Sequence, residues 1–184
     1  PTTRRGRRFG AFGERSVICF PPTTIMNEQY IRIGSDTIIG PHVALSAGMV
    51  PGQVCVSDPV VSIGDRCLIG RGSGIVGHLS IEIGDDVYTG HHVYITDQNH
   101  GYDDRDLPIS VQTMPERPVR IGAGSWIGHG AVVLPGADIG RNVVTSLLLL
   151  IGVPIVAVLV MFTIIGIPLG LVLVGLVLPG LWWL

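Results

Sequence analysis

The sequence contains no lysine, and its last stretch, 142–184, contains no charged residue of any kind. Every charged side chain lies at or before Arg141, so an ordinary polar sequence precedes a long uncharged tail. The absence of lysine excludes catalysis through a lysine Schiff base. A formal net charge of −2 leaves no basic surface of the kind that nucleic-acid-binding proteins carry, so no nucleic acid is expected as a partner.

Cysteine is scarce. The chain holds Cys19, Cys55 and Cys67, and none of them belongs to a CxxC pair. This spacing fits reduced, buried small side chains of a cytosolic domain rather than a disulfide or zinc framework, so no metal is expected.

Glycine, in contrast, follows a regular pattern, because an aliphatic residue followed by glycine returns every six residues, or a multiple of six, within each block. The pairs are Ile33-Gly34, Ile39-Gly40, Ile63-Gly64, Ile69-Gly70, Ile83-Gly84, Ile121-Gly122, Ile127-Gly128 and Ile139-Gly140. A second column, four residues after each repeat start, holds mostly small or β-branched residues: Thr37, Val43, Cys67, Ser73, Leu79, Val87, Val93, Ser125, Ala131, Ala137 and Val143.

Neither a helix nor a strand alone repeats every six residues. Six residues form one short strand and a turn, and three such faces close a triangular coil of about eighteen residues. Stacked coils then bury a continuous aliphatic column. The pattern predicts an all-β parallel β-helix; a glycine-rich β-sandwich with chance spacing is the alternative.

The six-residue period fails between Ile95 and Ile121. A loop of that length inside a compact repeat is uncommon and is more often functional than not. It begins with the stretch TDQNHGYDD, in which His100 stands between the turn residues Asn99 and Gly101. His100 is therefore either a reactive imidazole held out on a loop or a polar residue in a turn.

The stretch RIGAGSWIGHGAVVLPGADIG, residues 120–140, resembles the tryptophan-containing coil of the hexapeptide-repeat acyltransferases. The resemblance covers about 31–144 and is nearest to the maltose, galactoside and colanic-acid O-acetyltransferases. It implies a left-handed parallel β-helix with an extruded loop, here 97–120, that carries a catalytic histidine. It also implies acetyl-CoA or another acyl-CoA as co-substrate, a sugar or glycoconjugate acceptor, and a homotrimer with the site between subunits.

Carried over residue by residue, the resemblance makes His100 the general base, because a return segment ending in Pro118-Val119 follows it as in the family. A sugar hydroxyl is a poor nucleophile until its proton is removed, and imidazole accepts that proton at neutral pH and later passes it to the leaving thiolate. Backbone N–H groups would hold the oxyanion. Glu116 loosely matches an acidic residue before the Pro-Val pair and is the second catalytic candidate, with an ordinary surface carboxylate as the alternative.

The other site candidates lie in the loop and in the coil that follows it. The cofactor-binding candidates are Trp126, Gly128, Gly130 and Ala131, and the acceptor-binding candidates are Asp97, Asn99 and Tyr102. Simple corner packing is the alternative for Trp126, and a solvated loop is the alternative for the acidic residues.

Of the remaining histidines, His129 lies on the coil that would face CoA, and the other four fit corner or surface positions, with lining of the cleft as the alternative for His91 and His92. His42 and His78 fit turn corners, whereas His91 and His92 occupy the exposed positions of a hexad. A zinc site of the β-helical carbonic anhydrase type needs a pair of histidines about five residues apart, and no two histidines here have that separation.

The chain departs from the family pattern in two places. The asparagine that assists the reaction in galactoside-type enzymes is missing from the approximately corresponding stretch Gly70-Arg71-Gly72. The repeat also ends after Val144, where the family continues with coils that complete the CoA channel.

The uncharged tail is long enough to cross a membrane, because the twenty apolar residues 146–165 form a helix of about 30 Å. The sequence therefore predicts an N-terminal arm or cap at 1–27, a β-helix at 28–145, and a transmembrane helix or helical hairpin at 146–184. This tail predicts a membrane-associated protein, and acyl-CoA chemistry favours a cytoplasmic position for its head domain. The chain begins at Pro1 rather than methionine, which fits a processed chain or a fragment.

A second class of function stays open. The stretch IIGIPLG in the tail resembles hydrophobic segments attached to bactofilin-like polymer-forming proteins. A membrane-tethered, non-catalytic β-helical scaffold is therefore the alternative, and an inactive truncated acetyltransferase is another. The loop histidine favours the enzyme, and the missing final coils favour the scaffold.

Overall fold

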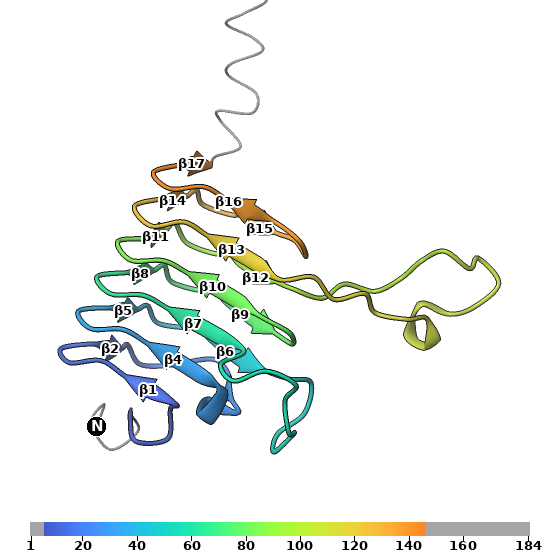
Figure 1. Cartoon of the computed structure of the whole chain (residues 1–184), viewed down its shortest axis with the longest axis horizontal. Helices are drawn as coiled ribbons and strands as arrows, with labels where there is room; N and C mark the ends of the chain where they lie inside the picture. The colour runs from blue at the N-terminus through green and yellow to red at the C-terminus, as the bar shows by residue number, and fades with distance from the viewer. Residues whose placement is uncertain (1–5, 146–184) are drawn as a thin grey trace, which may run out of the picture. The chain divides into compact units, whose positions relative to one another are not determined.

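The structure, a computed structural model, describes residues 6–145. Its strands stack as successive coils of a parallel β-helix with three faces (Figure 1). The first face contains β1 (Ala11–Phe12), β4 (Ile31–Ile33), β7 (Val61–Ile63), β10 (Ile81–Ile83), β13 (Val119–Ile121) and β16 (Asp138–Ile139). The second contains β2 (Val17–Ile18), β5 (Ile38–Ile39), β8 (Leu68–Ile69), β11 (Tyr88–Thr89), β14 (Trp126–Ile127) and β17 (Val144–Thr145). The third contains β3 (Ile25–Met26), β6 (Ala44–Ala47), β9 (Gly74–Gly77), β12 (Tyr94–Thr96) and β15 (Val132–Val133).

This architecture confirms the predicted parallel β-helix, and it fits the left-handed form that the resemblance implied. The aliphatic residues of the repeat point inward from all three faces. Ile33, Ile39, Leu45, Ile63, Ile69, Ile75, Ile83, Ile95, Ile121 and Ile127 are each at most 3% exposed. They form one apolar column along the axis, which is the main source of hydrophobic stabilisation.

Small polar residues of the second column join neighbouring coils at the corners. The Ser73 hydroxyl accepts a hydrogen bond from the Val93 N–H at 3.1 Å. The Ser125 hydroxyl donates to the Gly140 carbonyl at 2.9 Å and accepts from the Val143 N–H. A small hydroxyl therefore satisfies backbone groups that would otherwise be buried without a partner.

The glycine that follows each aliphatic residue lets adjacent coils approach closely. A β-carbon on Gly90, for example, would lie 2.5 Å from the backbone nitrogen of His129 in the next coil. The glycine column is thus a packing requirement between coils.

The coil stacking begins inside 1–27, the segment predicted as an arm or cap. β1, β2 and β3 pair in register with β4, β5 and β6. Phe12 takes the inward position that an isoleucine holds in later coils, pairing with Ile33. An aliphatic–glycine search does not detect this coil because an aromatic residue replaces the isoleucine.

The coils are also longer than the predicted eighteen residues in the middle of the stack. Ile63 pairs with Ile83, which lies twenty residues later, whereas Ile121 pairs with Ile139, eighteen residues later. The two additional residues fall in the turn 78–80 between β9 and β10. This turn explains the change of phase between Ile81 and Ile83 in the sequence.

Two excursions leave the stack at the corner between the third and first faces, 48–60 and 97–118 (Figure 1, right). The shorter one is held by Asn27, a 6% exposed residue, whose amide donates to the carbonyls of Ala47 at 2.6 Å and Val50 at 2.9 Å. The side-chain oxygen of Asn27 accepts from the Gly52 N–H at 2.7 Å. The second excursion is the predicted loop, and it contains one short 3-10 turn, η2 (Ile109–Val111).

The predicted membrane segment, 146–184, lies outside the described residues. Within 6–145, no helix has the length and apolar character needed to cross a membrane.

Candidate functional site

The long loop begins and ends in a narrow neck whose two sides run antiparallel. The Arg117 N–H donates to the Asp97 carbonyl at 2.8 Å, and Gln98 and Glu116 form a bridge beside them. Further out, the Gly101 N–H donates to a carbonyl of the returning side at 2.8 Å. The neck therefore holds Asn99 and His100 at a fixed distance from the third face.

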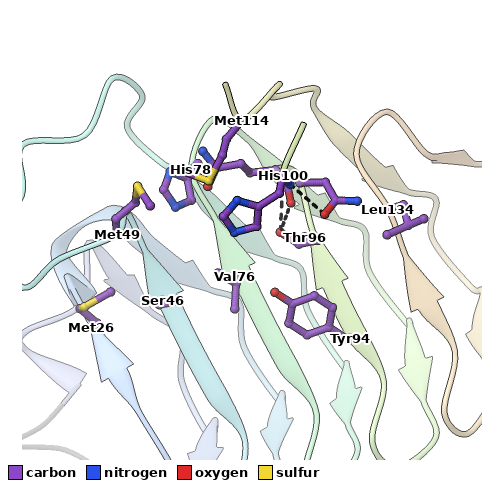
Figure 2. Close-up of a pocket in the computed structure, with 13 residues that line it drawn as sticks. Met26, Ser46, Met49, Val76, His78, Tyr94, Thr96, His100, Met114 and Leu134 are labelled. Carbon is purple, nitrogen blue, oxygen red and sulfur yellow. Dashed lines mark hydrogen bonds between the residues drawn. The ribbon is translucent and has the colours of Figure 1, made fainter. Parts of the chain in front are cut away.

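His100 projects into a cavity of about 420 Å³ between the third face and the neck of the loop (Figure 2). We call it the first hollow, and it is lined by Met26, Ser46, Gly48, Met49, Val76, His78, Tyr94, Thr96, Gln98, Asn99, His100, Met114 and Leu134. Its lining contains both apolar side chains, such as methionines and aliphatic residues, and side chains that form hydrogen bonds. Such a lining is typical of small-molecule sites.

A second hollow, of about 290 Å³, is also bordered by this histidine. It is lined by Asn99, His100, Gly101, Tyr102, Asp103, Pro115, Arg117, Leu134 and Pro135. Asn99, His100 and Leu134 border both hollows. His100 thus borders both hollows.

The structure gives Asp97, an acceptor-binding candidate, a different role. Asp97 is fully buried, at 0% exposure. Its carboxylate accepts hydrogen bonds from the backbone N–H groups of His78, Leu79 and Ser80, the shortest at 2.7 Å. Its oxygens are therefore occupied in holding the turn 78–80, and they are not available to an acceptor.

Asn99 and Tyr102 are exposed at the hollows. The Asn99 side-chain oxygen accepts the backbone N–H of His100 at 2.9 Å, which fixes the local turn. Tyr102 is 77% exposed and lines the second hollow. Both residues remain candidates for contact with a substrate.

Glu116, the second catalytic candidate, contacts a histidine other than His100. One carboxylate oxygen of Glu116 lies 3.5 Å from Nδ1 of His78, and the same oxygen accepts a hydrogen bond from the Gln98 amide at 3.1 Å. The His78 side chain is 8% exposed and lines the first hollow. His78 is therefore part of the site, and not simply a corner residue as the sequence suggested.

The sequence carried one signal for His78. The phase change between Ile81 and Ile83 marks a coil with extra residues, and those residues are the turn that contains His78. Extra residues in a repeat map to positions where the backbone leaves the regular corner.

None of the cofactor-binding candidates lines either hollow. Trp126 is on the outer surface of the second face, 46% exposed, between Tyr88 and Val144 of the adjacent coils. Gly128, Gly130 and Ala131 follow it, at the turn that leads to β15. The structure does not bring these four residues together with His100 in one chain.

Trp126 belongs instead to a row of apolar side chains along the second face. We call it the apolar stripe, and it consists of Val17, Ile38, Leu68, Tyr88, Trp126 and Val144, each paired in register with the next. All but the half-buried Leu68 are between 42% and 52% exposed. The outer positions of the first face are mostly polar by contrast, with Arg120 and Glu82 paired at 3.2 Å.

Within the described part of the chain, no group of three or more histidine, cysteine, aspartate or glutamate side chains is placed to hold a metal ion.

Two family descriptions match the repeat. The bacterial transferase hexapeptide repeat matches residues 118–146, and the hexapeptide repeat of succinyl-transferase matches residues 60–96. Both matches fall on coils of the observed β-helix.

Two curated relatives match parts of the chain. A protein of Mycobacterium tuberculosis that bears the name probable acetyltransferase is 46% identical over 81 residues, which cover 44% of this chain and 27% of the relative. WbbJ of Escherichia coli, named for O-acetyl transfer in lipopolysaccharide biosynthesis, is 28% identical over 132 residues, which cover 68% of this chain and 63% of WbbJ. The chain thus spans about a quarter of the first relative and less than two thirds of the second.

The fold is similar to that of solved structures. A variant of AntD, an N-acyltransferase from Bacillus cereus crystallised with dTDP and coenzyme A, aligns with a TM-score of 0.51 and 18% identity, over 78% of this chain and 76% of AntD. The repeat matches and the coiled fold identify residues 60–96 and 118–146 as hexapeptide repeats of the kind found in bacterial transferases, and both curated relatives that match the chain bear the names of acetyltransferases.

Proposed function

We propose that this protein transfers an acyl group from acyl-CoA to a hydroxyl of a sugar or glycoconjugate, with His100 as the general base. The observation that carries the proposal is the position of His100 at the boundary of two hollows. A transfer between two substrates needs a proton-accepting group within reach of both. The relatives named for acetyl transfer support the same reaction class, and AntD is an example of this fold with coenzyme A bound.

The proposed chemistry is a single displacement through a tetrahedral intermediate. Neutral imidazole takes the proton of the acceptor hydroxyl while the oxygen forms a bond to the thioester carbonyl carbon. The carbonyl electron pair moves to oxygen, where backbone N–H groups stabilise it. When the carbonyl re-forms, the carbon–sulfur bond breaks and the imidazolium returns its proton to the thiolate. The hydroxyl proton therefore ends on the thiol of CoA, and His100 is regenerated.

The two hollows suit different substrates. Arg117 lines the second hollow, where a cationic side chain favours the anionic donor. The first hollow carries His78, Tyr94, Thr96 and Asn99, whose hydrogen-bonding groups favour a polyol acceptor. We assign the donor to the second hollow and the acceptor to the first. Trp126, Gly128, Gly130 and Ala131 would contact the cofactor only from a neighbouring subunit.

The reaction is tested by thiol release from acetyl-CoA and from longer acyl-CoA donors, using the full chain in detergent with a panel of methyl glycosides. We expect thiol release that depends on the acceptor and exceeds the rate with water alone. The matched control contains the same protein without a glycoside. Thiol release no faster than the protein-free blank for every donor and acceptor would favour a scaffold and overturn the proposal.

We propose that the functional unit is the homotrimer that the resemblance to hexapeptide-repeat acyltransferases implies, and that the apolar stripe along the second face forms its interface. Exposed apolar rows rich in aromatic residues are typical of interfaces. A charge in the middle of the stripe would be buried without a partner on association.

The full chain in detergent is therefore expected to have the mass of three copies by light scattering, and Tyr88→Arg is expected to dissociate it. Asp138→Arg, on the polar first face, is the control and should leave the trimer intact. A native chain that is monomeric, or a trimer that persists in Tyr88→Arg, would contradict this interface.

We also propose that 146–184 attaches the domain to a membrane, with the β-helix in the cytoplasm. The uncharged apolar run supports the attachment. The requirement for cytoplasmic acyl-CoA supports the orientation.

A further inference from the structure

His78 lies in the same hollow as His100 and is held from two directions. On the backbone side, the buried Asp97 carboxylate accepts the His78 N–H at 2.8 Å and also the next two N–H groups of the turn. On the side-chain side, Nδ1 of His78 lies 3.5 Å from the Glu116 carboxylate. Figure 2 shows the His78 imidazole facing the same hollow as that of His100.

Glu116 is in turn held by the neck of the loop. The Gln98 amide donates to its carboxylate at 3.1 Å, and Gln98 and Glu116 pair across the neck. The carboxylate therefore reaches His78 from a segment that is far away in sequence and fixed in space. A carboxylate beside one ring nitrogen favours the proton on that nitrogen, which leaves the other nitrogen as an acceptor.

The second ring nitrogen of His78, Nε2, has no hydrogen-bond partner among residues 6–145. The side chain is only 8% exposed, and buried polar groups are normally paired. An acceptor nitrogen of this kind, facing a hollow, is suited to a ligand that donates a hydrogen bond. His78 borders the first hollow and not the second, so that ligand would lie on the acceptor side of His100.

We propose that His78 is an acceptor-binding residue whose Nε2 accepts a hydrogen bond from a hydroxyl adjacent to the one that His100 deprotonates. The acceptor class is then a sugar or other alcohol with two neighbouring hydroxyls. Glu116 is a positioning residue, which acts by holding His78 in the tautomer with the proton on Nδ1. The expected effect of His78 on the reaction rests on the proposed acyl transfer. The tautomer of His78 does not depend on that function.

The tautomer is tested by nitrogen NMR on the full chain labelled at histidine, with His78→Gln to assign the resonances. We expect His78 to carry its proton on Nδ1, and we expect Glu116→Ala to move the equilibrium towards the Nε2–H form. His42, exposed at a different corner, is the internal control and should not respond. A proton on Nε2 in the native chain, or no response of His78 to Glu116→Ala, would overturn the assignment.

The acceptor contact is tested with two simple alcohols, a vicinal cyclohexanediol and cyclohexanol, as acceptors for acetyl-CoA. We expect the native chain to prefer the diol in kcat/KM by about 10-fold, the scale of one hydrogen bond to a positioned group. His78→Ala should lose this preference through a higher KM for the diol, with the KM for acetyl-CoA unchanged, whereas His78→Gln should keep part of it. His42→Ala is the matched control and should retain the full preference.

A His78→Ala chain that still prefers the diol would contradict the role of His78 while leaving acyl transfer intact. A native chain that cleaves no acetyl-CoA would contradict the proposed function instead. In that case, the binding of the diol to His78 is tested by adding the diol to the histidine-labelled protein and recording the nitrogen NMR spectrum. A shift of the His78 Nε2 resonance supports it, and an unchanged resonance overturns it.

Discussion

Replacement of His100 by alanine is expected to lower the rate of thiol release by about 10²–10⁴-fold, the usual contribution of a general base. The reason is that a neutral sugar hydroxyl must lose its proton as it attacks the thioester. The loss should appear in kcat, with little change in the KM for acyl-CoA, because the histidine acts on the reacting atoms rather than on the body of the donor. The measurement is steady-state thiol release by the full chain with its best acceptor.

The backbone around His100 is held by groups other than its imidazole, so the substitution should leave the fold intact. The Asn99 oxygen accepts the His100 backbone N–H, which alanine also possesses. His42→Ala serves as the control, since His42 is exposed at another corner and lines neither hollow. Activity in His100→Ala equal to that of the control would remove His100 as the base.

Replacement of Asp97 by alanine is expected to lower the free energy of unfolding by about 3–5 kcal/mol. Its carboxylate is fully buried and accepts hydrogen bonds from three successive backbone N–H groups. Alanine would leave these donors without partners in a partly buried turn, where each unpaired donor costs about 1–3 kcal/mol when it is shielded from water. The neck is affected as well, because Arg117 bonds to the backbone carbonyl of this residue.

The measurement is denaturant unfolding of the full chain in detergent. Asp97→Asn should lower the free energy of unfolding less than Asp97→Ala does, because the amide oxygen of asparagine still accepts some of these hydrogen bonds. Asp103→Ala is the matched control, since Asp103 is an exposed loop carboxylate whose loss should change stability by no more than about 0.5 kcal/mol. Equal stabilities of Asp97→Ala and Asp103→Ala would show that the carboxylate does not hold the turn.

The parts of the structure that follow from periodicity were predictable. Ile33, Ile63 and Ile127 occupy the inward column as the six-residue pattern predicts, because hydrophobic burial fixes which positions face the axis. The loop was predictable for the same reason, since the pattern stops at Ile95 and resumes at Ile121.

The shorter excursion, 48–60, was not predicted, because the isoleucine spacing across it is still a multiple of six. Leu45 and Ile63 are eighteen residues apart, a multiple of six, although 48–60 lies between them outside the regular coil. Periodicity detects a change of phase, and this insertion leaves the apparent phase unchanged.

Within the site, the roles of the polar residues were not predictable, because each role depends on contacts with residues that are far away in the sequence. Asp97 stands in a polar run that suggests a solvated loop, yet it binds the turn 78–80 of the preceding coil. Glu116 contacts His78 across the same neck. The local sequence does not indicate these contacts, because they form only when successive coils stack on one another.

The three corners of the β-helix differ in the length of the chain segments that link one face to the next. Four residues link the first face to the second in every coil, whereas the links from the third face to the first range from the short turn 78–80 to the loop 97–118. The two long excursions therefore emerge along one edge, and the buried column continues unchanged in the coils on either side of them. Under the proposed function, exchange of the loop beyond its neck is expected to alter the choice of acceptor without repacking the core, whereas replacement of Asp97 at the base of the loop is expected to lower stability.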